Sequence, residues 1–323
     1  MAKRNRFEQL DQAVQAMLAR PDARLLDLDP ALAPLLRVAA ELRDLPRPVF
    51  KERLKVDLQR RTSMATARVS FIPPGYRTLT PYLTVRDAAA LIDFVKQAFG
   101  AQERFRGTGG AGGIHCEVQI DDAMLMIGGG GKWEGTPMPT ALHLYVKDAD
   151  AVYQRALEAG AISLQPPTDQ FYGDREAGVK DLAGNHWYIA TNRATGHVPQ
   201  NCNTLMPFLH PKGADQVIDF LKRGLGAEEI SRSQSPEGVV QHAALRIGSS
   251  VIEMGEAHGE YQPMPTMFYL YVEDCDALYQ RALQAGGTSI SPPTDHPYGD
   301  RSGGVRDPFG NQWYLATHVK DVS

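Results

Sequence analysis

The chain has 323 residues, and its 34 lysines and arginines against 38 aspartates and glutamates give a formal net charge of −4. This length suggests about two or three domains, and the nearly balanced charge gives no electrostatic reason to expect nucleic acid or an anionic membrane as a partner. Only three cysteines occur, without close spacing, and no stretch is apolar for long enough to cross a bilayer, so we expect a cytoplasmic protein without a disulfide framework.

Residues 1–61 are predicted to form a small helical segment, because apolar residues recur there at helical spacing in three successive runs. The last run carries a basic side. We interpret that side as a solvated or docking face rather than a nucleic-acid element, since Glu52 and Asp57 lie within it. Residues 62–75 are rich in Ser, Thr, Ala and Pro and are predicted to be a linker.

The remainder of the chain repeats itself once. Tyr172-Gly173-Asp174-Arg175 returns as Tyr298-Gly299-Asp300-Arg301, 126 residues later, and several other short runs recur in the same register. An interval of this length indicates duplication of a whole domain rather than a solenoid, whose units span roughly 20 to 50 residues. We therefore place one domain at residues 76–195 and a second at residues 196–323.

Each copy contains two helices with clear boundaries. Apolar residues recur at positions i, i+3, i+4 and i+7 in these stretches. Asp87, Asp148 and Asp274 stand where an N-cap is expected, and Gly100 and Gly226 follow the helical runs, where left-handed C-caps favour glycine.

Short strands surround these helices. Apolar runs separated by Asp121-Asp122 in the first copy and by Gly248-Ser249-Ser250 in the second predict hairpins. Together with the helices they predict a βαβββ module that occurs four times, and hence an α+β fold.

At this level the sequence resembles the vicinal oxygen chelate superfamily, which includes glyoxalase I, bleomycin-resistance proteins and extradiol dioxygenases, and especially its PhnB-like branch. The resemblance covers about residues 76 to 319. It rests on Thr80-Pro81-Tyr82-Leu83, Ala98-Phe99-Gly100-Ala101, Leu142-His143-Leu144-Tyr145-Val146, the two Tyr-Gly-Asp-Arg runs, and Asp307-Pro308-Phe309-Gly310-Asn311-Gln312-Trp313.

The resemblance implies tandem glyoxalase/bleomycin-resistance-like domains, in which pairs of βαβββ modules curl their sheets into a cleft for a small molecule. Relatives pair their modules either within one copy or by exchange between copies, and the sequence leaves both arrangements open. Such a fold also hosts many different chemistries, so the reaction does not follow from it.

Metal-dependent members of that superfamily carry His or Glu on the first and fourth strands. The corresponding positions here are Thr80, Met126, Ala141 and Tyr188 in the first copy and Met206, Glu253, Met267 and Tyr314 in the second. Only Glu253 is a competent ligand for a hard metal ion, whereas a stable divalent site needs about three or four oxygen or nitrogen donors. We therefore expect the usual metal centre to be missing.

Strand alternation predicts which side chains line the cleft, because Cys116, Val118 and Ile120 must face the helices. Inward-facing aromatic rings suit a planar guest, although the same rings could simply fill a closed cleft. The predicted ligand-binding residues are His115, Glu117, His143, Tyr145, Tyr188, Phe208, His242, Arg246, Glu253, Tyr269, Tyr271 and Tyr314.

The sequence also predicts roles for three further groups of residues. Arg246, diagonal to Glu253 across the predicted hairpin, is expected to form an ion pair with it. In each Tyr-Gly-Asp-Arg run the aspartate is expected to bond backbone amides while Arg175 or Arg301 braces the next loop. Cys116, on the packing face, is expected to be a buried apolar residue rather than a nucleophile.

A competing interpretation keeps a metal. His210, His242 and Glu253 could converge as two imidazoles and one carboxylate, a set that suits divalent iron, manganese or zinc. The protein would then be a lyase, isomerase or dioxygenase. First-copy histidines could alternatively act as ligands or as general acid and base, or be hydrogen-bonded cleft residues.

The leading hypothesis is a small-molecule binding protein that sequesters a planar or aromatic ligand without the usual metal centre. No catalytic residue is assigned. We expect no nucleic-acid or membrane partner, and either a monomer that acts as an internal pseudo-dimer or a homodimer. A third hypothesis is that the helical segment recruits a protein partner.

Overall fold

The computed structural model describes residues 12, 16, 69–109 and 111–322. The chain divides into two units, Met1–Arg68 and Val69–Ser323, and every helix and strand discussed below belongs to the second. The predicted N-terminal helical segment and the first part of the predicted linker thus lie outside the described residues, apart from two single positions. Residues 69–75 contain neither helix nor strand.

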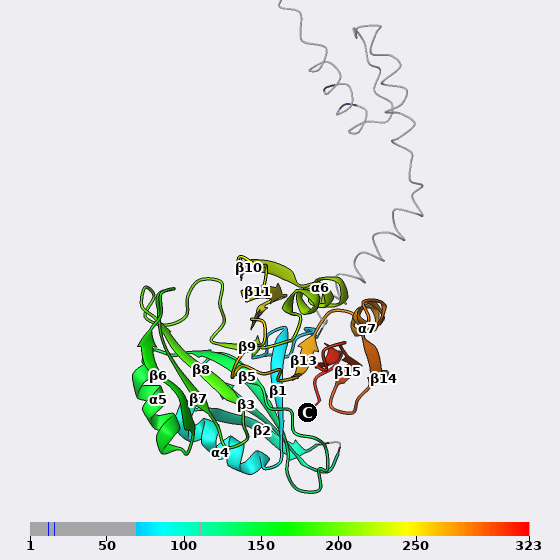
Figure 1. The fold of residues 1–323 in the computed structure, drawn as a ribbon. Coiled ribbons are helices and arrows are strands. Elements are labelled where there is room, and N and C mark those ends of the chain that lie inside the picture. The colour runs from blue at the N-terminus through cyan, green and yellow to red at the C-terminus, as the bar shows by residue number, and fades with distance from the viewer. Residues whose placement is uncertain (1–11, 13–15, 17–68, 110, 323) are drawn as a thin grey trace, which may run out of the picture. The chain divides into compact units, whose positions relative to one another are not determined.

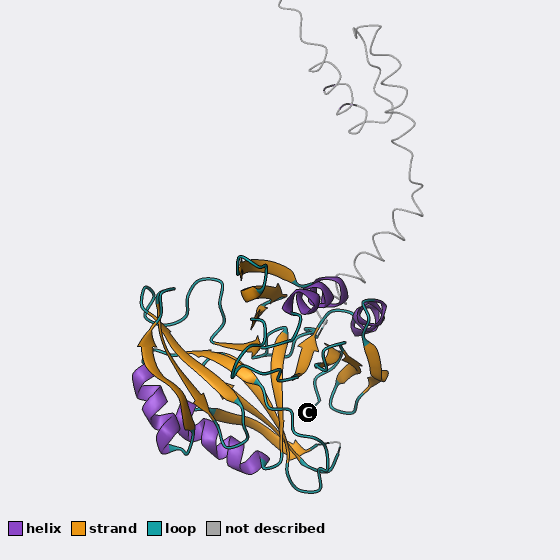
Figure 2. Cartoon of the chain, in the orientation of Figure 1, coloured by secondary structure: helices purple, strands orange, loops and turns teal. Residues whose placement is uncertain are grey.

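The predicted βαβββ module occurs four times (Figures 1 and 2). Module 1 contains β1 (Leu79–Val85), α4 (Ala88–Phe99), β2 (Gln102–Thr108), β3 (Ile114–Ile120) and β4 (Ala123–Gly129). Module 2 contains β5 (Ala141–Tyr145), α5 (Ala149–Glu158), β6 (Ile162–Asp169), β7 (Asp174–Lys180) and β8 (His186–Asn192). Module 3 contains β9 (Leu205–Leu209), α6 (Ala214–Leu225), β10 (Glu228–Gln234), β11 (Val240–Ile247) and β12 (Ser250–Met254). Module 4 contains β13 (Met267–Tyr271), α7 (Cys275–Gln284), β14 (Thr288–Asp295), β15 (Asp300–Arg306) and β16 (Gln312–His318).

The helices begin where their capping residues predict. The side chains of Asp87, Asp148 and Asp274 each accept a hydrogen bond from the backbone N–H three residues later, which satisfies a donor that the helix leaves free. The helix α6 lacks such a side chain and follows Gly213. There the Glu256 carboxylate accepts from the backbone N–H groups of Gly213 and Ala214 instead.

The strands form two eight-stranded mixed sheets. Sheet A has the order β14-β15-β16-β13-β1-β4-β3-β2, and sheet B has the order β10-β11-β12-β9-β5-β8-β7-β6. Module 1 therefore pairs with module 4, through Leu79 opposite Leu270, and module 2 pairs with module 3, through Ala141 opposite Phe208. Each sheet contains one module from each copy, which is the exchanged arrangement of the two that the sequence left open.

The apolar cores follow the copies rather than the sheets. One core joins the helix-facing residues of modules 1 and 2, and the other joins those of modules 3 and 4. Trp187 and Trp313 are fully buried in the two cores, and they contact Phe99 and Phe268 at ring-centroid distances of 4.5 and 4.4 Å. Each copy thus forms its own apolar core, whereas each sheet contains strands from both copies.

Two equivalent residues of the copies contact each other in the interior. The hydroxyls of Thr140 and Thr266, which are 126 residues apart, are hydrogen-bonded to each other. Contact between repeat-equivalent side chains is the signature of a pseudo-two-fold relation between the copies. No helix in the described part of the chain is long and apolar enough to cross a membrane.

Candidate functional site

Each sheet has an inner face, on the side opposite its helices, and we call these face A and face B. Strand register divides the predicted ligand-binding residues between them. Face A carries His115, Glu117, Tyr269, Tyr271 and Tyr314. Face B carries His143, Tyr145, Tyr188, Phe208, His242, Arg246 and Glu253. The two sets form two separate candidate sites.

A cluster of ionisable side chains lies at the centre of face B. Nδ1 of His143 is 2.8 Å from Oε2 of Glu253, and Nε2 of His143 is 3.6 Å from Oε2 of Glu176. On the other side of the carboxylate, Nε2 of His242 is 3.5 Å from Oε1 of Glu253. We call these four residues the His143 cluster. His143 and Glu253 are each only 6% exposed, so this is a buried ion pair.

The two central charges stabilise each other against burial. Burial disfavours the charged imidazolium, but the adjacent Glu253 carboxylate outweighs it and raises the pKa of His143 to about 9. Burial likewise disfavours the Glu253 carboxylate, and His143 together with His242 overcomes this and lowers the pKa of Glu253 to about 2. Burial raises the pKa of Glu176, which has no such strong partner. At neutral pH the His143–Glu253 pair is therefore ionised.

Glu253 does not pair with Arg246, contrary to the expectation from the hairpin. Ala244 is the direct cross-strand neighbour of Glu253, and Arg246 lies opposite Val251. Because β9 and then β5 follow β12 in sheet B, the Glu253 side chain meets His143 instead. The exchanged pairing of modules is what supplies this partner.

Asp174 extends the polar region of face B. Its carboxylate accepts hydrogen bonds from the Tyr145 hydroxyl at 2.7 Å and from Nδ2 of Asn192 at 2.6 Å. The expectation that this side chain bonds backbone amides is therefore corrected, because strand β7 turns Asp174 onto the inner face. The Tyr172 hydroxyl similarly donates to Glu176 at 3.2 Å.

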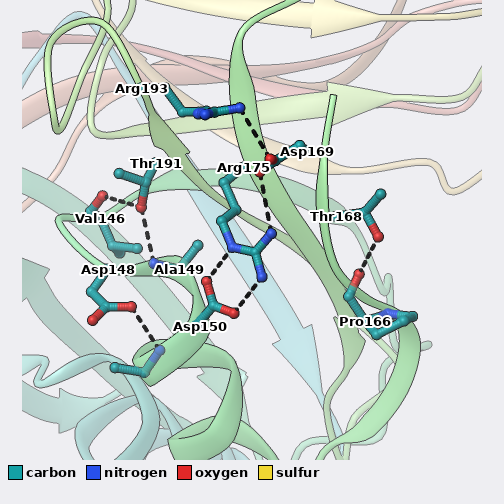
Figure 3. Close-up of polar contacts among 11 residues, drawn as sticks. Val146, Asp148, Ala149, Asp150, Pro166, Thr168, Asp169, Arg175, Thr191 and Arg193 are labelled. Atoms are coloured by element: carbon teal, nitrogen blue, oxygen red, sulfur yellow. Dashed lines mark hydrogen bonds and ion pairs between the residues drawn. The ribbon is translucent and has the colours of Figure 1, made fainter. Parts of the chain in front are cut away.

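Arg175 has a structural role, but it holds helix α5 and the end of β6 rather than the next loop that the sequence suggested. Its guanidinium pairs with Asp150 in the first turn of α5 and with Asp169 at the end of β6 (Figure 3). Arg193 also reaches Asp169, at 3.0 Å. Arg301 makes the corresponding contacts in the second copy, so neither arginine lies on a ligand face.

Aromatic rings border the His143 cluster on face B. Phe208 lies 5.5 Å from Tyr188 and 4.8 Å from His210 between ring centroids, and His210 lies 5.1 Å from Tyr261. We call these four residues the aromatic wall. The Tyr188 hydroxyl and Nε2 of His210 are hydrogen-bonded at 2.9 Å, and burial lowers the pKa of His210 to about 4. His210 is thus a neutral member of the wall.

The predicted His210, His242 and Glu253 triad is not assembled. His242 approaches Glu253, but His210 bonds Tyr188. Within residues 69–109 and 111–322, no group of three or more His, Cys, Asp or Glu side chains is arranged to hold a metal ion. His210 follows the last residue of β9, before Pro211, and its ring packs with Phe208 and Tyr261 instead.

The exchange also regroups the positions at which metal-dependent relatives carry ligands. Face A receives Thr80, Met126, Met267 and Tyr314, and face B receives Ala141, Tyr188, Met206 and Glu253. The single carboxylate among these eight side chains is already engaged by two histidines. Neither donor set fits the family's metal centre.

Face A has a different polar arrangement. The Tyr82 hydroxyl is 2.9 Å from Nδ1 of His115, and Nε2 of His115 is 3.3 Å from Glu117. Burial disfavours the Glu117 carboxylate, but the nearby His115 and Tyr76 outweigh it and lower the pKa of Glu117. Tyr269 and Tyr271 both donate to Asp300, which also bonds Nδ1 of His318 at 2.7 Å.

The sequence did not single out several of these residues. Tyr76 directly follows the predicted linker, and no motif distinguishes Glu176. Tyr261 lies in the loop after β12, where the sequence has no periodicity. Alternation along β7 from Asp174 could have indicated Glu176.

Cys116 is buried on the packing face as expected, and burial raises the pKa of its thiol to about 11.

Comparison with known proteins places this geometry in a family. The model of the Glyoxalase/Bleomycin resistance protein/Dioxygenase superfamily matches residues 77–189 and 209–315, which is more than half of the chain. Uncharacterized proteins of Mycobacterium bovis and Mycobacterium tuberculosis are each 36% identical over 130 residues, covering 37% of this chain and 86% and 76% of those proteins. The crystal structure of glyoxalase I from Zea mays covers 75% of this chain and 92% of its own, with a TM-score of 0.60 and 14% identity, a likeness of fold. The chain belongs to the Glyoxalase/Bleomycin resistance protein/Dioxygenase superfamily.

Proposed function

We propose that the protein binds a small molecule with a planar aromatic body on face B and sequesters it without a resident metal ion. One observation carries this proposal: the aromatic wall stands directly beside the His143 cluster. Phe208 is the register partner of Glu253, and its ring centroid lies 6.0 Å from that of His242. An apolar ring surface next to a few convergent polar groups is the usual composition of a ligand site.

The aromatic wall suits a flat guest. Tyr188, Phe208 and Tyr261 are each only partly buried, so their rings retain surface for a ligand. A planar molecule that stacks on such rings gains about 0.5–1.5 kcal/mol for each aromatic pair beyond the area that it buries.

The His143 cluster suits a polar substituent on the same guest. The side chain of His242 is 42% exposed, and it contacts the buried Glu253, whose side chain is 7% exposed. Because His143 holds Glu253 ionised and in place, a ligand group does not have to order that carboxylate when it binds. Fixed polar groups of this kind lower the free-energy cost of association.

The fused copies support a monomeric binder. One chain supplies both modules of each sheet, so a second chain is not required to complete either face. The metal-dependent alternative would need three or four donors that converge, and face B does not bring such a set together. We also propose that the protein belongs to the PhnB-like branch and lies in the cytoplasm.

A planar fluorescent dye tests the proposal. Proflavine should bind purified protein and quench on binding, and Phe208→Ala should weaken that binding on the order of tenfold by removing a stacking ring. Tyr82→Ala is the matched control, because Tyr82 is the equivalent of Phe208 126 residues earlier, on face A, and it should leave the affinity unchanged. Equal weakening by both variants, or no binding by proflavine and a panel of neutral and anionic planar compounds, would contradict the proposal.

Metal analysis separates the alternative. A stoichiometric transition metal in the purified protein, lost in the His242→Ala and Glu253→Ala double variant, would replace sequestration with a metal-dependent reaction. We expect no such coupling between these two residues and metal content.

A further inference from the structure

The two inner faces are each crossed by a short segment that precedes the first strand of a module. We call residues 72–76 strap A and residues 198–202 strap B. The backbone N–H of Tyr76 donates to Pro73 O at 3.1 Å, and that of Cys202 donates to Pro199 O at 3.2 Å. Both turns contain a residue of positive φ, 86° at Gly75 and 68° at Asn201. The straps are therefore the same turn, repeated 126 residues apart.

The straps end in side chains of very different size. On face A, the Tyr76 ring packs edge-on against Tyr271 at a centroid distance of 5.5 Å, and burial together with the nearby Glu117 carboxylate raises the pKa of Tyr76. On face B, the equivalent position holds Cys202, which packs with the buried Tyr145, the equivalent of Tyr271. A phenol ring in one face is thus replaced by a thiol in the other.

The residue that faces each strap from the sheet changes in the same direction. Glu117 is the cross-strand partner of Met126, and Ala244 is the cross-strand partner of Glu253 in the corresponding hairpin. Glu117 and Ala244 are therefore equivalent positions. The Tyr76–Glu117 pair of face A corresponds to Cys202 and Ala244 in face B, and both replacements remove bulk.

The exposure of neighbouring side chains differs between the two faces. His115 and His242 are equivalent by the same register, and their side chains are 22% and 42% exposed. Face B leaves its histidine more accessible than face A does, in agreement with the smaller residues at its strap.

We infer that the chain holds one ligand site rather than two, because Tyr76 and Glu117 fill face A at the place where face B carries the smaller Cys202 and Ala244. Tyr76 and Glu117 are thus specificity-determining residues, and they confine binding of the planar ligand to one of two related faces. This inference rests on the proposed function for its ligand, but the closure of face A is a property of the protein alone.

Binding stoichiometry tests the ligand part. Titration of the full chain with proflavine should give one equivalent bound, and the double variant Tyr76→Cys/Glu117→Ala should give two. Tyr76→Phe, which keeps the ring and loses only the hydroxyl, is the matched control and should retain one. Two equivalents in the wild-type protein, or one equivalent in a double variant that unfolds at the wild-type denaturant midpoint, would overturn the inference.

Thiol labelling tests the closure without any ligand. Cysteines introduced by Tyr82→Cys on face A and Phe208→Cys on face B occupy equivalent positions, and peptide mass spectrometry distinguishes them from the three native cysteines. We expect N-ethylmaleimide to modify position 208 on the order of tenfold faster than position 82, since access limits thiol reactivity. Adding the substitutions Tyr76→Cys and Glu117→Ala to each of these variants should make the labelling rates at positions 82 and 208 equal. The new thiol at position 76 is measured separately, on its own peptide.

The two experiments fail separately. Equal labelling rates at positions 82 and 208 would overturn the closure of face A. Absence of dye binding together with a large difference in labelling would refute the proposed function and leave the closure supported.

Discussion

His143 and Glu253 belong to different copies of the repeat, yet Nδ1 of His143 lies 2.8 Å from Oε2 of Glu253 in the interior of sheet B. The two residues stand on β5 and β12, which are separated by β9. The pair therefore exists only because the copies exchange modules. It fixes the centre of the proposed site and links the site to the stability of the fold.

Removal of one partner should destabilise the protein strongly. Glu253→Met leaves His143 buried without its carboxylate, and we expect a loss of about 3–5 kcal/mol in the free energy of unfolding. The double variant His143→Tyr/Glu253→Met installs the residues that face A carries at the equivalent positions, Tyr269 and Met126, and should recover most of the loss. Urea denaturation measures both, and a double variant less stable than the single one would contradict this account.

The same pair should give a defined dependence of stability on pH. The pKa of His143 is raised from 6.5 to about 9, so its contribution is complete below pH 6.5 and is lost as the pH rises through 9. The pKa of Glu253 is lowered from 4.5 to about 2, so its contribution is complete above pH 4.5 and is lost as the pH falls through 2. The stability difference between wild type and Glu253→Gln should therefore be largest between pH 4.5 and 6.5 and should shrink by pH 9.5. NMR titration of the His143 ring provides an independent check, and an apparent pKa below 7 would refute the assignment.

The turns before β8 and β16 should matter more for folding than their surface position suggests. The buried Asp181 carboxylate accepts from the backbone N–H groups of Ala183 and Asn185, from the Asn185 amide and from the Trp187 indole. Asp181→Ala leaves these donors unsatisfied, and we expect a loss of about 3 kcal/mol or more.

A surface control distinguishes this turn from ordinary ion pairs. Arg175→Ala removes partly exposed salt bridges to Asp150 and Asp169 and should cost far less than Asp181→Ala, because exposed ion pairs contribute little to stability. Chemical denaturation of both variants, with Asp307→Ala as the equivalent of Asp181→Ala in the second copy, measures the contrast. Similar costs for Arg175→Ala and Asp181→Ala would argue against the buried network.

Phe171 should affect ligand binding without affecting stability. Its side chain is 99% exposed, and its ring lies 5.1 Å from that of Tyr172, whose hydroxyl donates to Glu176 of the His143 cluster. Phe171→Ala should change the free energy of unfolding by no more than about 0.5 kcal/mol. If the ring covers a ligand on face B, the same variant should release proflavine severalfold faster in stopped-flow dissociation, whereas an unchanged rate would place Phe171 outside the site.

Local signals in the sequence predicted the elements well. The aspartate caps and the glycines after the helices depend on neighbouring residues, and the repeat at 126 residues is read directly from the sequence. The helices and strands that they indicated in residues 76–323 are present. The packing face that carries Cys116 followed from the alternation of side chains along its strand.

The site depended on information that local patterns do not contain. Whether β5 lies beside β9 or beside β1 is a choice between tertiary arrangements of similar modules, and that choice gives Glu253 the partner His143 rather than Arg246. His210 had a plausible inward position, but its hydrogen bond to Tyr188 comes from packing at the end of β9. Tyr76 precedes the first strand, where no periodicity indicates which way a side chain points.

Covalent joining of the two copies has a consequence for how such a protein can change. In a dimer of identical chains, every substitution would appear twice, once on each side of the symmetry axis, so that a carboxylate suited to one cavity would also be imposed on the other. In the fused chain, Glu253 alters one face while Met126 remains on the other, and Cys202 and Tyr76 differ in the same way. Because both copies lie in one chain, a substitution changes only one of the two faces. The side chains of each face can therefore differ while the fold stays the same.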